Sequence, residues 1–326
     1  FHDGHVSPIP QPNIDYVLAA TRSIAPFVKD GDLVILESTS PVGTTEQMQL
    51  VLRDAGVDVD ALHMAYCPER VMPGKIMIEL IENDRIVGGL TSAATQAVAE
   101  FYRTFVRGTV VETDAKTAEM CKLTENSFRD VNIAFANELS LICDEEGINV
   151  WDLIQLANRH PRVNILQPGT GVGGHCIAVD PWFIVARNEA NARMIRTARE
   201  VNNYKTEWVI EKIKLAAADF YAHNGKTPRI ACLGLAFKSD IDDLRESPAL
   251  EVAKALIEQG YDVSAVEPNI ESLALLPLLD LTTALIQVDV IAVLVKHREF
   301  MRPEIQQKLR GLRTLDFCGA LDGLAF

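Results

Sequence analysis

The sequence lacks the features of a disulfide scaffold, a membrane protein and a nucleic-acid-binding protein. Its six cysteines are widely spread, with no CxxC pair, a pattern typical of reduced thiols in the cytoplasm. No apolar run reaches the ~18–20 residues that a membrane helix requires. Acidic residues number 45 against 31 basic ones, for a formal net charge of −14, and such a surface repels a nucleic-acid backbone. No His/Cys group has the spacing of a structural zinc site. We therefore expect a cytoplasmic protein without a metal, membrane or nucleic-acid partner.

The remaining composition is that of an ordinary globular protein. Of 326 residues, 48% are hydrophobic and 23% charged, with 19 glycines and 15 prolines. At roughly 150 residues per domain, this length predicts two or three domains.

Short apolar runs alternate with helical patterns in the first third of the chain, which predicts a parallel sheet flanked by helices. The predicted strands are 32–37, 62–66, 85–89 and 109–111, and the predicted helices are 14–28, 44–54 and 92–105.

The middle of the chain is helical, and a second α/β unit follows it. Helices are predicted at 115–146, 150–158 and 190–222, and the last is long enough to bridge two domains or to form a dimer seam. A linker at 223–228 precedes strands 229–237, 262–266, 290–295 and 314–317, with a helix at 247–259. The predicted domains are 1–112, 113–222 and 223–326.

A glycine-rich loop leads to Cys176. Its glycines match G-x-G-x-x-G, but the segment follows a helix and a proline-containing loop, so we do not interpret it as a dinucleotide fingerprint. Glycines would bring backbone N–H groups close to a reacting centre, with Cys176 as the nucleophile. A buried structural thiol remains the alternative.

Lys122, Asn126 and Arg129 have a spacing that places them on one face of the predicted helix 115–146. Lys122 and Asn126 could hydrogen-bond an oxyanion. A solvated polar face would show the same pattern.

Polar residues also follow three predicted strands, where ligands of doubly wound sheets bind. Glu69 could act as a base or position a water, although a surface ion pair is equally consistent. Ser247 and Pro248 begin a helix, so the cations before it predict a phosphate site. The strand-end residues are Ser38, Thr39, Glu69, Arg70, Lys238 and Arg245.

Together and in this order, these motifs resemble those of the UDP-glucose/GDP-mannose dehydrogenase family over essentially the whole chain. The resemblance rests on the strand-end Ser-Thr-x-Pro, the Pro-Glu, the Lys-x-x-x-Asn helix, the Gly-Gly-x-Cys-x-x-x-Asp loop and the Phe-Lys…Arg-Glu-Ser-Pro segment. It implies an α/β fold with two Rossmann-like doubly wound parallel sheets, the first incomplete, joined by a helical middle domain. Independently of the resemblance, we expect a homodimer formed through the long helix 190–222.

The resemblance implies an NAD-dependent, four-electron oxidation of a UDP-sugar C6 alcohol to a carboxylate. Cys176 would form a thiohemiacetal and then a thioester, and Lys122 and Asn126 would stabilise the oxyanion. Asp180 would orient Lys122 or a water. The family also implies base or water-positioning roles for Glu69 and Thr39, substrate contacts from Arg70, Arg162, Lys238, Gly173 and Gly174, and cofactor contacts from Ser38, Thr39 and Arg245.

Within the family, residues 158–165 and 173–182 are most similar to the branch that oxidises UDP-N-acetyl-D-mannosamine for surface polysaccharides. UDP-N-acetylglucosamine is the alternative substrate. Val179 and His175 stand where UDP-glucose enzymes carry Lys and Ser, which argues against UDP-glucose. Residues 315–319 lack a lysine common in the family, so the contacts expected there are in doubt.

The family begins with a strand and a G-x-G-x-x-G turn, which do not precede Phe1 in this sequence. We therefore expect a fragment that oxidises nothing measurable by itself, although it could still bind UDP. Two other interpretations remain open: a non-catalytic UDP-binding or dimerising polypeptide, and a thiol hydrolase or transferase built on Cys176.

Overall fold

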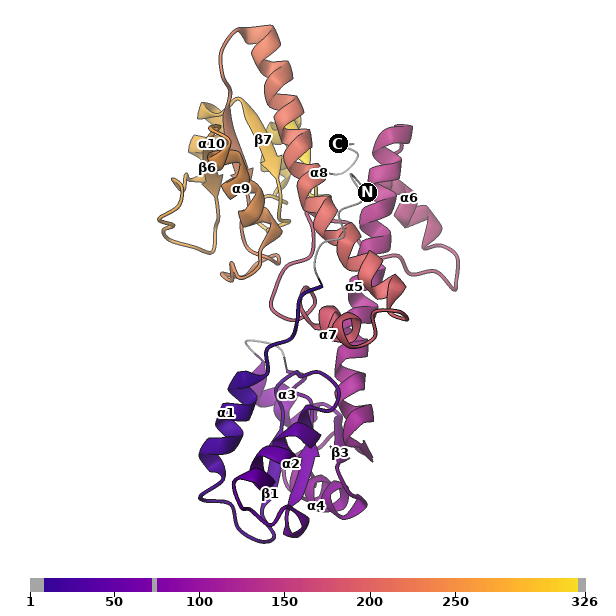
Figure 1. The fold of residues 1–326 in the computed structure, drawn as a ribbon. Coiled ribbons are helices and arrows are strands. Elements are labelled where there is room, and N and C mark those ends of the chain that lie inside the picture. Colours follow the sequence, from indigo (N-terminus) through magenta and orange to yellow (C-terminus); the bar gives the residue numbers. More distant parts are fainter. Residues whose placement is uncertain (1–8, 72–74, 322–326) are drawn as a thin grey trace. The chain divides into compact units, whose positions relative to one another are not determined.

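The computed structural model describes residues 9–71 and 75–321. The chain divides into two compact units (Figure 1). The first contains the described residues up to Ser127 together with Asp180–Arg193, and the second contains Phe128–Val179 and Met194 onward. Helix α5 (Ala115–Glu146) contributes to both units, and each unit is described separately below.

The first unit is built on a four-stranded sheet in the order β1-β2-β3-β4. Strands β1 and β2 pair in parallel, as do β3 and β4, but β2 and β3 are antiparallel, with Ala65 opposite Gly89. The sequence predicts the strands but not this reversal, which follows a connection through the short helix α3. The bounds are β1 Leu33–Leu36, β2 His63–Tyr66, α3 Ile76–Glu82, β3 Arg85–Gly89 and β4 Val110–Asp114.

Helices pack on both faces of this sheet because its strands carry apolar residues on both sides. Met64 and Tyr66 join the core formed with α1 and α2, whereas Ala65 and Cys67 pack against α4. Side chains that alternate along β2 therefore serve two different cores. The helices are α1 Asp15–Ile24, α2 Thr44–Asp54 and α4 Ser92–Arg103.

The second unit contains a fully parallel sheet in the order β6-β5-β7-β8. Helices α8 and α9 cover one face, and α10 and α11 cover the other. The strand order reverses beside β5, and such a switch point opens a ligand crevice at the carboxyl ends of the strands. The elements are β5 Arg229–Leu233, α9 Pro248–Glu258, β6 Asp262–Val266, α10 Leu281–Gln287, β7 Val290–Val293, α11 Pro303–Arg310 and β8 Thr314–Asp316.

The helical part of the second unit consists of the later turns of α5, α6 (Val150–Ala157) and α8 (Arg193–Asn224). Asn149 caps α6 by accepting hydrogen bonds from two main-chain N–H groups of its first turn. The chain between α6 and α7 (Asp180–Arg187) contains the glycine loop that ends at Cys176.

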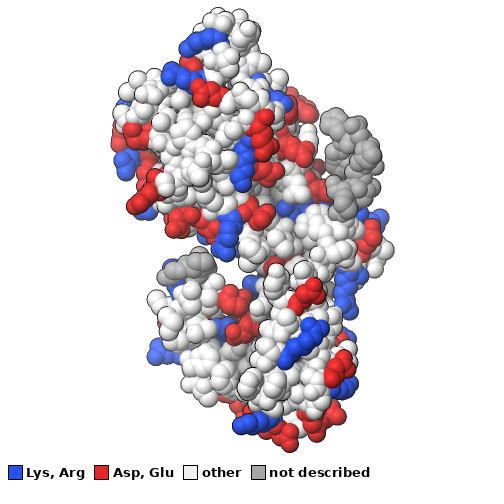
Figure 2. Space-filling view, turned by 60° about the vertical axis from the view of Figure 1, so that its left-hand side comes forward, with Lys and Arg blue, Asp and Glu red and all other residues white. Residues whose placement is uncertain are grey.

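The predicted α/β fold class is confirmed, and the bounds of α2, α5, β3 and β6 match the prediction. The sequence-based prediction missed the short helices α3, α7, α10 and α11. The three-domain division stays a prediction. On the face shown in Figure 2, basic side chains are interspersed with acidic ones. Within residues 9–71 and 75–321, no helix combines the length and apolarity needed to span a bilayer.

Candidate active site

Asn126 and Asp180 meet in the first unit. The Asn126 amide nitrogen donates to Asp180 Oδ2 at 2.5 Å, and the two residues are 7% and 3% exposed. Asn126 lies on α5, whereas Asp180 begins α7, so two helices contribute to this pair. Lys122 lies one turn before Asn126 on α5 and is half-buried. Of the predicted helix face, Asn126 is thus buried and Lys122 half-buried, whereas Arg129 is exposed.

Glu119 fixes the loop that carries Ser38 and Thr39. Its fully buried carboxylate accepts the Gly43 and Thr45 main-chain N–H groups, the second at 2.9 Å, and the Thr45 hydroxyl at 2.7 Å. These N–H groups lie at the start of α2. A helix start normally offers free N–H groups to an anion, but here the protein's own carboxylate takes them.

Arg70 and Glu69 follow β2. Arg70 forms an ion pair with Glu125 at 2.6 Å, so its charge is balanced within the protein. The exposed Glu69 carboxylate accepts the Val71 N–H. Because Arg70 already has an acidic partner, it is a weaker candidate for contacting an anionic substrate than an unpaired cation would be.

The glycine loop of the second unit packs against the segment that follows β5. The Gly174 N–H donates to the Arg245 carbonyl at 3.3 Å. A Cβ on Gly173 would lie 2.4 Å from the Glu246 carbonyl oxygen, and one on Gly174 would lie 2.9 Å from the Phe237 ring. Only glycine permits so close an approach, which explains why glycine occupies both positions.

Cys176 follows this contact and is solvent-exposed. Its thiol interacts electrostatically with Arg245, although the hydrogen bonds that the Arg245 guanidinium donates to Asp243 are the larger cause that raises the pKa of Arg245. Arg245 in turn holds the pKa of the Asp243 carboxyl below its usual value. The thiol thus lies within electrostatic range of Arg245, whose charge is already paired with that of Asp243.

The predicted phosphate site has the expected helix start. Ser247 caps α9 by accepting the Leu250 N–H, and Pro248 occupies the first turn. Lys238 and Arg245 are exposed in the same segment, but Arg245 is paired with Asp243 at 2.7 Å. Arg162 is also exposed, in the loop after α6. Of the two cations in this segment, Arg245 therefore has an acidic partner, whereas Lys238 has none among the described residues.

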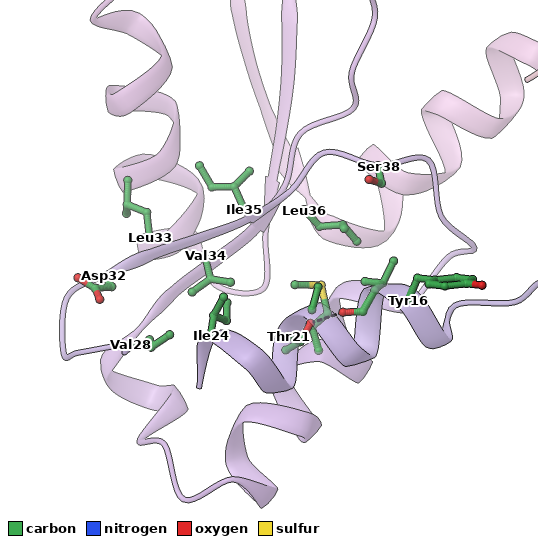
Figure 3. Close-up of a pocket in the computed structure, with 13 residues that line it drawn as sticks. Tyr16, Thr21, Ile24, Val28, Asp32, Leu33, Val34, Ile35, Leu36 and Ser38 are labelled. Carbon is green, nitrogen blue, oxygen red and sulfur yellow. Dashed lines mark hydrogen bonds between the residues drawn. The ribbon is translucent and has the colours of Figure 1, made fainter. Parts of the chain in front are cut away.

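A pocket of about 550 Å³ lies beside β1 and α1 in the first unit. Tyr16 and Ser38 lie toward one end and Asp32 at the other, with aliphatic side chains between them (Figure 3). Among the site residues predicted from the sequence, only Ser38 is one of the described residues that line this pocket. The pocket does not gather the predicted catalytic residues.

Comparison with known proteins identifies the family. Domain models of the UDP-glucose/GDP-mannose dehydrogenase family match residues 4–106 (NAD binding domain), 116–204 (central domain) and 231–323 (UDP binding domain). The chain belongs to this family. The resemblance seen in the sequence is confirmed, and the match over residues 4–106 identifies NAD as the cofactor.

Three individual relatives show which members of the family the chain is similar to. UDP-N-acetyl-D-mannosamine dehydrogenase of Yersinia pestis is 56% identical over 314 residues, which is 90% of this chain and 75% of the relative. NDP-N-acetyl-D-galactosaminuronic acid dehydrogenase of Ralstonia solanacearum is 55% identical over 306 residues, covering 90% of this chain and 71% of the relative. The structure of UDP-D-ManNAc dehydrogenase from Pyrococcus horikoshii has a TM-score of 0.84 at 37% identity, covering 96% of this chain and 75% of that one.

The described part of the first unit offers hydroxyl groups to NAD. Ser38 is exposed and Thr39 half-buried directly after β1, at the carboxyl edge of the sheet where a dinucleotide lies in this class of fold. The start of α2 does not fit the pyrophosphate because Glu119 already accepts its N–H groups. The hydroxyl groups of Ser38 and Thr39 are therefore the polar groups of this strand end that remain for a ligand.

The sequence-based prediction missed several buried polar residues. Glu119 could have been found, because it lies one turn before Lys122 on the same helix. Lys205 could not: its ammonium lies 2.7 Å from Ser140 Oγ and 3.8 Å from the Trp208 ring centroid, and burial lowers its pKa to about 7. Ser140 is 65 residues away in sequence, so no local pattern indicates this contact.

Proposed function

We propose that the protein is a dehydrogenase that oxidises the C6 alcohol of UDP-N-acetyl-D-mannosamine to the carboxylate of UDP-N-acetyl-D-mannosaminuronate. The observation that carries the proposal is the exposed Cys176 thiol, on a glycine loop packed against the segment after β5, in a chain 56% identical to a UDP-N-acetyl-D-mannosamine dehydrogenase. We place this reaction in the cytoplasm, in line with six free thiols, and in surface polysaccharide synthesis.

Cys176 retains the substrate between the two oxidation steps. Loss of a hydride from C6 and of the hydroxyl proton first converts the alcohol to an aldehyde, to which the thiolate adds to form a thiohemiacetal. Loss of a second hydride from C6 and of the thiohemiacetal hydroxyl proton then gives a thioester. Water then hydrolyses the thioester, which releases the carboxylate and regenerates the thiol. NAD⁺, when bound, accepts one hydride in each oxidation.

The buried pair of Asn126 and Asp180 supplies positioned polar groups. Lys122 and Asn126 stabilise the oxyanion that develops on the substrate oxygen, and the hydrogen bond to Asp180 fixes the Asn126 amide. Asp180 also orients Lys122 or a water during proton transfer. Thr39 and Glu69 act on the attacking water or as a base, and Ser38 and Arg245 contact the cofactor.

The UDP part of the substrate binds the second unit. Lys238 follows β5 at the switch point and contacts the diphosphate. Gly173 and Gly174, packed against Glu246 and Phe237, present their backbone to the substrate. Arg162 contributes a further cation, and Arg70 a weaker one because of Glu125.

Replacing the nucleophile tests the mechanism. We expect Cys176→Ala to lower NADH formation at least about 1,000-fold without loss of thermal stability, because the thiol is exposed. Mass spectrometry of Cys176→Ser with substrate and NAD⁺ should detect a sugar adduct or the aldehyde. Cys318→Ala, which removes a half-buried thiol, is the matched control. Full turnover by Cys176→Ala would contradict the covalent route.

The substrate is tested by comparing kcat/KM for UDP-N-acetylmannosamine, UDP-N-acetylglucosamine and UDP-glucose. UDP-N-acetylglucosamine is the alternative substrate, and a higher kcat/KM for it would replace our assignment. The wild-type polypeptide is assayed first, which gives the reference rate of NADH formation. UDP binding without NADH formation would favour a UDP-binding polypeptide instead.

We also propose a homodimer, formed through the helical part of the second unit. Phe128, Phe135 and Ile142 follow one another at seven-residue intervals on α5 and are 68%, 52% and 50% exposed. Residues at this spacing share a helix face, and exposed apolar patches of this kind mark interfaces.

A further inference from the structure

Buried polar side chains of α5 and α8 lie behind the glycine loop that leads to Cys176. None of them is more than 4% exposed, although polar side chains of this kind are normally at the surface. They are Asp130 and Asn137 of α5, and Arg199, Asn202 and Thr206 of α8.

Hydrogen bonds join these side chains into a series that ends on the loop. Arg199 and Asn202 both donate to Asp130 Oδ1, at 2.6 and 2.8 Å, and the Asn137 amide donates to Asn202 Oδ1 at 2.9 Å. The Asn137 oxygen then accepts the Gly169 main-chain N–H at 2.9 Å. Arg199 and Asn202 thereby orient the amide that holds the start of the loop.

Thr206 holds the next two residues of the loop. Its hydroxyl donates to the Thr170 carbonyl at 3.1 Å, and the Thr170 hydroxyl donates to the Leu294 carbonyl at 2.6 Å, just after β7. A Cβ on Gly171 would lie 2.4 Å from Thr206 Oγ1. The loop is therefore seated directly on the α8 side chain.

The far end of the same loop is fixed by Phe237 and Arg245, as described above for Gly173 and Gly174. Cys176 follows two residues later. The position of its thiol is thus determined by two anchors, one on α5 and α8 and one on the segment after β5.

We propose that Asn137 and Thr206 are positioning residues that fix the main chain of residues 169–174 and thereby hold the Cys176 thiol in its solvent-exposed position. This inference rests on the proposed function, in which Cys176 is the nucleophile. Stability alone does not require such groups, because well-packed apolar residues often replace buried polar networks without loss. Here the polar atoms are directed at the loop's own N–H and carbonyl groups.

The alkylation rate of each cysteine tests the proposal without requiring turnover. Wild type, Thr206→Val, Thr206→Ser and Asn137→Leu are treated with iodoacetamide and followed by mass spectrometry. Losing one anchoring hydrogen bond should lower the Cys176 rate about fivefold in Thr206→Val and Asn137→Leu, because a loop with one anchor fewer keeps the thiol in its solvent-exposed position for less of the time. Thr206→Ser keeps the hydroxyl and should retain the wild-type rate.

The buried thiols of Cys143 and Cys232 are internal controls. A purely structural role would increase their alkylation through partial unfolding, whereas loss of positioning changes Cys176 alone. Wild-type Cys176 rates in both Thr206→Val and Asn137→Leu, or a joint rise at all three cysteines, would overturn the proposal. Failure of the proposed function would be seen separately, as NADH formation that survives in Cys176→Ala.

Discussion

At the scale of single residues, Glu267 shows how one buried carboxylate organises a strand end. It follows β6 and accepts the Leu235 and Ala236 N–H groups at 2.7 and 3.1 Å. His297 Nδ1 accepts the Asp240 N–H, so its Nε2 carries the proton and donates to Glu267 at 3.1 Å. The acidic side chain thus stabilises the turn after β5 from within the protein.

These contacts predict a pH-dependent stability of the second unit. Burial raises the pKa of Glu267, but the hydrogen bonds from His297 and from main-chain N–H groups outweigh it and lower the pKa to about 2. A lowered carboxyl pKa stabilises the fold above the unfolded value and loses this effect as pH falls. We expect the unfolding free energy to fall by about 3 kcal/mol from this group between pH 5 and pH 2, measured by urea unfolding followed by tryptophan fluorescence.

Glu267→Gln should remove this part of the pH dependence. Glu271→Gln changes an exposed carboxylate four residues later and should leave the dependence unchanged. An identical fall in stability in wild type and Glu267→Gln would show that other groups cause it.

At the scale of elements, Glu119 connects α5 to the start of α2. Helices begin with unsatisfied N–H groups that a nearby side chain usually caps. Gly43 precedes α2 with a φ of 90° and provides no side chain for this purpose. A carboxylate from another helix therefore replaces the local cap, and it ties the loop of Thr39 to the helix of Lys122 and Asn126.

Glu119→Gln should destabilise the first unit by about 1–3 kcal/mol, because an NH₂ group would then face the Gly43 N–H in the buried site. Urea unfolding and hydrogen exchange of residues 38–48 measure the effect, and exchange should increase there. Glu46→Gln is the control, because Glu46 of α2 forms only an exposed ion pair with Lys116 of α5. This substitution should cost less than about 0.5 kcal/mol. Equal losses in the two variants would refute the capping role.

At the scale of the whole molecule, an exposed apolar stripe on α5 predicts self-association. Phe135→Glu with Ile142→Glu places two charges in the stripe, and we expect the dimer dissociation constant to rise at least about tenfold because buried charges at an interface are costly. Light scattering over a concentration series measures it. Ile286→Glu changes a residue 78% exposed on α10 and should leave the constant unchanged. A wild-type chain that remains monomeric throughout would reject the homodimer.

Local signals in the sequence were sufficient to predict the long helices and to recognise the family. The stretch 115–146 contains no glycine or proline and forms α5 over that range, and Ser247-Pro248 predicted the observed start of α9. The short helices α3 and α10 have seven residues each, too few for a helical period to stand out. The predicted catalytic residues lie within short sequence motifs, so the sequence could name these residues. It could not give their contacts, which join different motifs.

The sequence by itself determined the α/β class, the helical middle and the likeness to sugar-nucleotide dehydrogenases, and it named Cys176 as the candidate nucleophile, because each depends on residues close together in the chain. Only the tertiary structure decided the antiparallel pairing of β2 and β3, the capping of α2 by Glu119, and the seating of the glycine loop on Asn137 and Thr206. The physical reason is that hydrogen bonds such as Glu119 to Thr45, 74 residues apart, and Thr206 to Thr170, 36 apart, form only when folding brings distant segments together.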